Sequence, residues 1–114
     1  MHELGIVIEI VKQIEEYKTE KKIHEIETLV LQIGELSGVV PHYIEDVYPM
    51  AIENTSLSDM KLKIEIAPGI GKCHSCGLNF NLVQNDNICP LCGHDKWDIL
   101  MGTELLIKEI HAKE

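Results

Sequence analysis

Arginine is absent from this chain of 114 residues, so its ten basic side chains are all lysines. They face nineteen acidic side chains, and the formal net charge is −9. Nucleic-acid binding generally needs a basic face and favours arginine for bidentate contacts. The composition therefore argues against a nucleic-acid partner and favours protein or cation partners.

Aromatic residues are also scarce, at 4%, with a single Phe and a single Trp. Hydrophobic residues still make up 45% of the chain, so Ile, Leu and Val must fill the core of one compact domain, with or without a small appendage. No apolar run approaches the roughly 18 residues that a membrane span requires. The start of the chain lacks a basic region and a small-residue cleavage site, and we expect a cytoplasmic protein.

Cysteine occurs only four times, and all four positions lie within one short block: Cys73, Cys76, Cys89 and Cys92. The spacing C-x2-C-x12-C-x2-C is typical of a tetrahedral zinc site built from two knuckles, with Zn–S distances of about 2.3 Å. Gly77 and Gly93 follow the two knuckles, where a tight turn often needs a positive φ. A closed shell of four thiolates leaves no position for water or substrate, so this zinc is predicted to be structural.

Two other interpretations of the cysteines are a disulfide framework and a redox Cys-x-x-Cys. The first needs an oxidising compartment, and the second does not need a second copy of the motif. Zinc is therefore the preferred interpretation. His74 and His94 lie beside the knuckles, and we expect both to be solvated bystanders of a four-cysteine site.

Two segments have helical apolar spacing. In residues 4–17 the apolar positions are Val7, Ile10, Val11, Ile14 and Tyr17. In the second segment they are Ile44, Val47, Tyr48, Ala51 and Ile52, after a proline at position 41 that suits a first helical turn. Pro49 is expected to kink or split this second helix near Tyr48.

Three segments have the alternation or β-branched content of strands: residues 26–34, 60–66 and 105–110. Residues 67–72 are a linker by composition, and the cysteine block follows it. The predicted fold class is α+β, with a small three-stranded sheet, two helices and an inserted zinc ribbon. The predicted domains are an α/β domain of residues 1–67 and 103–114, and a zinc-ribbon domain of residues 68–102.

The chain opens with Met1, His2 and Glu3. The Met1 amine, the backbone nitrogens of His2 and Glu3, and the His2 imidazole can reach one ion through small chelate rings. Ni(II) accepts square-planar nitrogen donors, whereas zinc prefers a tetrahedron. Protons would compete for the amine and the imidazole, so such a site is weak in acid.

Several motifs together resemble one family. They are the opening Met1-His2-Glu3 before an amphipathic helix, Gly34-Glu35-Leu36-Ser37-Gly38-Val39, the paired knuckles with Cys89-Pro90-Leu91-Cys92-Gly93, and Gly102-Thr103-Glu104-Leu105. In this order, and over essentially the whole chain, they resemble the HypA/HybF family of nickel-insertion chaperones in [NiFe] hydrogenase maturation.

The resemblance implies a nickel site centred on His2, with further donors from Met1 and Glu3, and a structural zinc on the four cysteines. It implies that nickel is handed to the hydrogenase large-subunit precursor together with a GTPase maturation partner, and in some organisms to urease maturation proteins. It also implies two helices on a three-stranded sheet from which the zinc domain projects.

No nucleophile has an adjacent base, and no Gly-rich loop has the context of a phosphate site, so we expect no catalytic residues and no enzyme activity. Two other functions stay open. One is a zinc-ribbon protein-interaction adaptor with no nickel role, and the other is a thiol redox protein that uses residues 89–92. Exposed strand edges in a small sheet are compatible with a monomer or a weak dimer.

Overall fold

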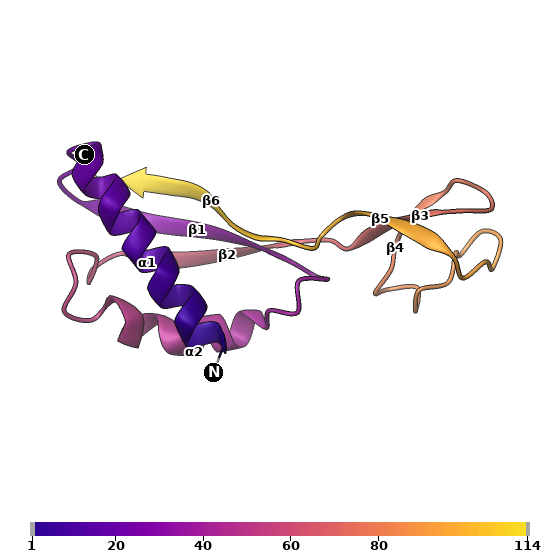
Figure 1. The fold of residues 1–114 in the computed structure, drawn as a ribbon, viewed down its shortest axis with the longest axis horizontal. Helices are drawn as coiled ribbons and strands as arrows, with labels where there is room; N and C mark the ends of the chain where they lie inside the picture. The colour runs from indigo at the N-terminus through magenta and orange to yellow at the C-terminus, as the bar shows by residue number, and fades with distance from the viewer. Residues whose placement is uncertain (1, 114) are drawn as a thin grey trace.

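The computed structural model describes residues 2–113, with the side chains from Glu3 onward, and forms an elongated molecule of 53 × 28 × 17 Å (Figure 1). Two helices and six strands follow one another along the chain. They are α1 (His2–Glu20), β1 (Ile26–Gly34), α2 (Pro41–Ile52), β2 (Lys61–Ala67), β3 (Ile70–Cys73), β4 (Asn79–Asn81), β5 (Trp97–Met101) and β6 (Leu105–Ala112).

The strands form two separate three-stranded sheets, in the orders β2-β1-β6 and β4-β3-β5. β2 runs parallel to β1, because α2 crosses over between them, and β6 returns antiparallel on the other side of β1. We call α1, β1, α2, β2 and β6 the α/β unit, and residues 70–101 the ribbon unit. The α+β fold class, with two helices and a three-stranded sheet, is confirmed.

The α/β unit buries one apolar core between its helices and its sheet. The central strand β1 directs alternate residues Leu29, Leu31 and Ile33 toward the helices, each about 1% exposed. Leu29 pairs with Leu62 of β2 and Ile110 of β6, so the neighbouring strands continue the same apolar face. Burial of each such side chain contributes about 1.5–3 kcal/mol, which makes this core the main source of stability of the unit.

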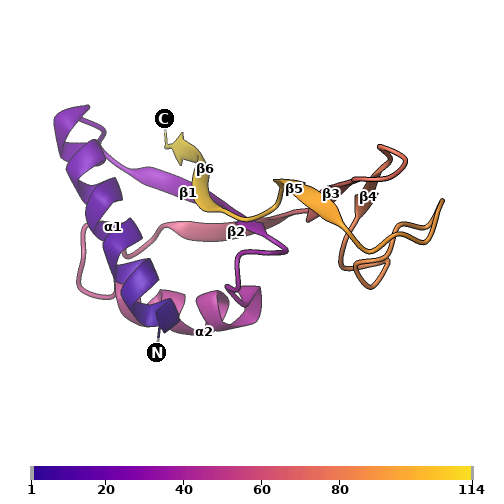
Figure 2. The same ribbon diagram turned by 45° about the vertical axis from the view of Figure 1, so that its right-hand side comes forward.

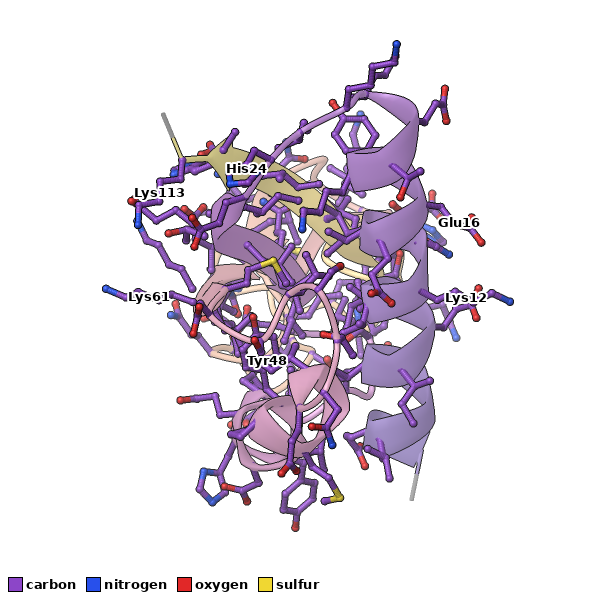
Figure 3. All side chains as sticks on the ribbon, turned by 90° about the vertical axis from the view of Figure 1, so that its left-hand side faces the viewer. Lys12, Glu16, His24, Tyr48, Lys61 and Lys113 are labelled. Atoms are coloured by element: carbon purple, nitrogen blue, oxygen red, sulfur yellow. The ribbon has the colours of Figure 1, made fainter. Side chains whose placement is uncertain are left out.

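Both helices present the predicted apolar faces to this core. The buried residues are Val7, Ile10, Val11 and Ile14 of α1 and Ile44, Val47, Tyr48 and Ile52 of α2. Figure 3 shows Lys12 and Glu16 on the opposite side of α1, pointing away from the molecule. Tyr17 was expected on the buried face but is 42% exposed, because it lies near the end of α1 beyond most of the core contacts.

Of the two effects predicted for Pro49, a kink or a split, the split does not occur, and α2 continues through it to Ile52. A proline removes one backbone donor, the one that would bond to the Glu45 carbonyl, but Glu53 N still donates to the Pro49 carbonyl at 3.2 Å and closes the last turn. Tyr48, just before it, points into the molecule (Figure 3) and its hydroxyl donates to the Met60 carbonyl at 2.7 Å. This bond joins α2 to the segment that leads into β2.

Residues 70–72 were expected to form part of a linker but belong to β3, which pairs with both β4 and β5. A Cβ on Gly71 would lie 2.8 Å from Leu82 Cδ2, so this glycine allows close packing of the ribbon unit. The glycine that suggested a linker is thus needed for close packing within the ribbon unit. The alternation in residues 60–66 predicts one buried face made of Met60, Leu62, Ile64 and Ile66, but Ile66 is 51% exposed near the end of the edge strand β2.

Candidate metal centre

The two cysteine knuckles of the ribbon unit have the same backbone structure. Gly77 N donates to the Cys73 carbonyl at 3.0 Å, and Gly93 N donates to the Cys89 carbonyl at 2.9 Å. Both glycines have a positive φ, 78° and 77°, as the sequence predicted for the turn after each knuckle. Glycine adopts this conformation without steric cost, and a residue with a Cβ would be strained there.

The knuckles bring the four cysteine sulfurs together, all within 4.8 Å of one another. Cys73 Sγ lies 3.6 Å from Cys92 Sγ, and Cys76 Sγ lies 3.6 Å from Cys89 Sγ. A disulfide would need a distance of about 2.05 Å, whereas a zinc tetrahedron with Zn–S bonds of about 2.3 Å has S–S edges of about 3.8 Å. The cysteines are free, and their spacing fits a four-coordinate zinc ion.

The pKa values of three of the thiols, Cys73, Cys76 and Cys89, are shifted by nearby backbone N–H groups, burial and neighbouring sulfurs. The backbone N–H of Cys76 points at Cys73 and lowers the pKa of its thiol to about 6. Burial acts to raise the pKa of Cys89, but backbone N–H groups of Cys92 and Leu91 outweigh it, so that pKa is also lowered. The Leu78 N–H favours a Cys76 thiolate, yet burial and the neighbouring sulfurs outweigh it and raise its pKa to about 12. A divalent cation at the centre would remove this conflict by stabilising all four thiolates at once.

The apolar cluster of the ribbon unit is small. Its buried members are Phe80, Leu82, Cys73 and Cys89, with Leu36, Leu78 and Trp97 packed against them. Two of its four buried side chains are therefore candidate metal ligands. So little apolar burial is typical of small units that need a bound metal ion for folding.

The histidines beside the knuckles lie outside the sulfur cluster. His74 Nε2 lies 2.9 Å from Asp98 Oδ1, and both side chains are largely exposed. His94 is exposed, and only its carbonyl takes part in the knuckle, as the acceptor for Cys89 N. Among the side chains of residues 3–113, the one group of three or more His, Cys, Asp and Glu residues close enough to share an ion consists of the four cysteines.

The other candidate metal ligands are at the start of the chain. Met1 and the His2 side chain lie outside the described residues. The backbone of His2 begins α1, and Glu3 follows in the first turn with a half-buried side chain. The first four N–H groups of an α-helix have no partner within the helix, so the backbone nitrogens of this segment are not committed to helical hydrogen bonds.

Sequence reasoning assigned no role to Glu35 and Leu36, although they lie in a motif that it singled out. Both lie in the loop after β1, and their side chains contact residues more than thirty positions away. Loop composition does not reveal such distant contacts. None of the helices among the described residues is long and apolar enough to cross a membrane.

Comparisons with known proteins agree along the chain. A family model for hydrogenase/urease nickel incorporation, metallochaperone, HypA, matches residues 1–112. A hydrogenase maturation factor HypA from Trichodesmium erythraeum is 38% identical over 114 residues, which is 100% of this chain and 97% of the relative. Another from Geobacter sp. (strain M21) is 34% identical over 113 residues, 99% of this chain and 100% of the relative.

Two solved structures have the same fold. The solution structure of the Ni metallochaperone HypA from Helicobacter pylori matches with a TM-score of 0.67 and 21% identity over 96% of each chain. The solution structure of a HypA protein matches with a TM-score of 0.71 and 23% identity, over 99% of this chain and 97% of the other. The whole-chain match to the family model and to curated relatives shows that this chain belongs to the HypA family of nickel metallochaperones for hydrogenase maturation.

Proposed function

We propose that this protein binds Ni(II), its cargo, through Met1, His2 and Glu3 and delivers it during maturation of [NiFe] hydrogenase. The observation that carries the proposal is the extent of the family match, which begins at residue 1 and so includes this terminal donor set. The donors are the Met1 amine, the His2 imidazole and the backbone nitrogens of His2 and Glu3. Four nitrogens in a plane suit Ni(II) better than zinc.

A site at the end of a chain is suited to transfer. Its ligands belong to one short segment at the start of α1, so a receiving protein can replace them one at a time without opening the apolar core. Protons compete for the amine and the imidazole, so nickel affinity is expected to fall as the pH decreases.

In this proposal Cys73, Cys76, Cys89 and Cys92 hold a structural Zn(II). Zinc would neutralise the crowded thiolates and stabilise the ribbon unit, and the closed shell would leave no position for a reacting group. A reduced four-thiolate site fits a cytoplasmic location, where thiols are kept reduced.

We propose that the protein is not an enzyme. The hollow of about 240 Å³ between the two units is lined by a single ionisable side chain, Glu104, and a second, wide-open hollow on the surface of α1 is lined by Thr19 and three glutamates, with no histidine, cysteine or lysine. The proposed partners are the hydrogenase large-subunit precursor and a GTPase maturation partner, with urease maturation proteins as a further recipient. We propose a monomer or weak dimer that binds neither nucleic acid nor membranes.

The nickel site is tested by titrating Ni(II) into zinc-loaded protein with its native amino terminus, by calorimetry. Two variants are titrated alongside: one has a single extra residue before Met1, and the other is His2→Ala. We expect one tightly bound nickel in the native chain and a loss of affinity of at least about 100-fold in both variants, since each loses a nitrogen donor.

A matched control is His24→Ala, because His24 is an exposed histidine that lies far along the chain from the amino terminus. It should bind nickel as the native chain does, and all four proteins should keep one zinc. Equal affinity in the native and extended chains would place the nickel elsewhere. If the native chain bound no nickel at all, the zinc-ribbon adaptor would become the better function.

A further inference from the structure

The two units are joined at a narrow waist, where three segments of chain lie together (Figure 1). Residues 67–70 lead from β2 into β3, residues 101–105 lead back from β5 into β6, and the end of β1 reaches between them. Figure 2 shows the ribbon unit extending from this waist, clear of both helices. The orientation of the ribbon unit therefore depends on contacts at the waist.

Backbone atoms approach very closely there. Leu36 N donates to the Gly102 carbonyl at 2.7 Å, and Glu35 N donates to the Ala67 carbonyl at 2.9 Å. A Cβ on Gly34 would lie 2.1 Å from the Gly102 oxygen, which no side chain can tolerate. The segment after β1 is thus hydrogen-bonded to both connecting segments, but these bonds end on residues that precede or follow the ribbon strands.

One side chain reaches beyond the connecting segments. Glu35 Oε1 accepts hydrogen bonds from Gly69 N at 2.8 Å and from Asn81 Nδ2 at 2.9 Å. Gly69 belongs to the connection into β3, whereas Asn81 is in β4, which pairs with β3 inside the ribbon unit. Among the described residues, this is the only hydrogen bond between the loop after β1 and a ribbon strand.

The Glu35 carboxylate is ionised at neutral pH. Hydrogen bonds from the Gly69 backbone and then from the Asn81 side chain hold its pKa below the usual value, against a smaller effect of burial. Hydrogen bonds to a charged acceptor are shorter and stronger than neutral ones. Leu36 adds an apolar contact, because its side chain packs against Gly69 and the ribbon cluster.

We propose that Glu35 is a positioning residue, whose carboxylate fixes the ribbon unit in one orientation relative to the α/β unit. Asn81 and Gly69 are its two attachment points, and the close backbone packing at Gly34 and Gly102 provides the pivot. Without the carboxylate, the ribbon unit stays folded around its four sulfurs but reorients about the connecting segments. Any partner that contacts both units must then select one arrangement from many.

The test measures orientation by NMR on zinc-loaded protein, with residual dipolar couplings and ¹⁵N relaxation. In the native chain we expect one alignment tensor and one rotational correlation time for both units. In Glu35→Ala we expect two distinct tensors and a shorter correlation time for the ribbon unit. Glu35→Gln keeps an oxygen acceptor at the same position and should therefore show the single tensor of the native chain. This recovery would show that the acceptor itself holds the orientation.

A second variant keeps the proposal testable if Glu35→Ala fails to fold. Asn81→Asp retains the Oδ1 acceptor for Gln84 N, at 2.8 Å, but replaces the donor that faces Glu35 with a second carboxylate. It should release the ribbon unit while the zinc content and the ribbon chemical shifts are unchanged.

The matched control is Glu27→Ala, an exposed glutamate near the other end of β1, and it should behave as the native chain does. A single, unchanged tensor in both Glu35→Ala and Asn81→Asp would overturn the proposal, because the backbone contacts would then suffice. Two tensors in the native chain would overturn it equally. None of these outcomes depends on nickel, so they are independent of the test of the nickel site.

Discussion

In the ribbon unit, cysteine side chains fill part of the core, a role that large apolar side chains have in the α/β unit. Cys73 and Cys89 are each 2% exposed and lie against Phe80 and Leu82, while Cys76 and Cys92 close the site from the solvent side. The sulfurs of Cys73 and Cys89 thus belong both to the core of the ribbon unit and to the proposed metal shell. Loss of one sulfur removes a ligand and leaves a core too small to persist.

Replacement of Cys76 with Ser tests this role. We expect bound zinc to fall from one per chain to none, and the ribbon unit to unfold, because three thiolates and a hydroxyl are a poor tetrahedral shell. The α/β unit should remain folded, and nickel affinity at the amino terminus should be largely retained. Ser75→Ala is the control, since Ser75 is exposed and lies between Cys73 and Cys76 in the sequence. This variant should keep its bound zinc. Stoichiometric zinc in Cys76→Ser would contradict the four-thiolate assignment.

At the scale of elements, α2 has two attachments of different kinds. Its apolar face packs into the core, and the Tyr48 hydroxyl donates to Met60 just before β2 begins. The first attachment is non-directional, whereas the second fixes where the connection after α2 meets the sheet. Loss of such a buried hydrogen bond lowers stability mainly because the buried acceptor is left without a partner.

We expect Tyr48→Phe to lower the free energy of unfolding by about 1–2 kcal/mol, because the Met60 carbonyl loses its donor. Urea unfolding followed by circular dichroism measures the change. Tyr43→Phe is the matched control: Tyr43 lies in the same helix but is about half exposed, so its effect should be within about 0.5 kcal/mol. Equal effects of the two substitutions would show that the buried hydrogen bond of Tyr48 does not contribute more to the free energy of unfolding than an exposed tyrosine hydroxyl does.

Burial also raises the pKa of Tyr48 to about 12, from an ordinary value of 10.0. Between pH 10 and pH 12 the folded state therefore keeps the phenol proton, whereas the unfolded state loses it. The contribution of this group to stability is therefore fully present below pH 10 and is lost as the pH rises from 10 toward 12. The native chain should lose more stability than Tyr48→Phe over this interval, and parallel losses would contradict the assignment.

Periodicity was sufficient to predict both helices and the three strands of the α/β unit, because each buries a regular apolar face. It could not predict the order β2-β1-β6, since alternation shows which face is buried and not which strand is the neighbour. Ile66 continues the regular alternation of β2 but is 51% exposed, because alternation shows which face of a strand is apolar and not how far the core extends along it.

The ribbon strands and the waist were harder to predict for another reason. β4 has only three residues, and β3 contains a glycine that packing requires, so neither has a periodic pattern. Glu35 looked like a polar loop residue because both of its hydrogen-bond partners are distant in sequence. The sulfur cluster was predictable because metal coordination fixes the spacing of its ligands.

At the scale of the whole molecule, the helices and the proposed metal centre lie in different units. Both helices are in the α/β unit, whereas the ribbon unit has only short strands and the single tryptophan, Trp97, whose Nε1 donates to the Asn87 carbonyl at 2.9 Å. Circular dichroism and tryptophan fluorescence therefore report on different units. This separation allows the metal dependence of the two units to be compared in one sample.

Removal of zinc with a chelator should change the Trp97 emission while leaving the helical signal at 222 nm within about 10% of its starting value. The reason is that the metal supplies the folding free energy of the ribbon unit only, while the α/β unit has its own apolar core. Readdition of zinc should restore the emission. A parallel loss of both signals would show that the two units fold as one cooperative whole.

The ribbon unit lies between two strands of another sheet, so both of its ends stay anchored whether or not it is folded. Without metal, residues 68–104 would become a closed loop held by β2 and β6. Closing a loop of this length costs about 3 kcal/mol of chain entropy, and the α/β unit bears that cost in either state. The proposed zinc would then order a loop whose ends already meet, so the metal centre could be emptied and refilled while the α/β unit remains intact.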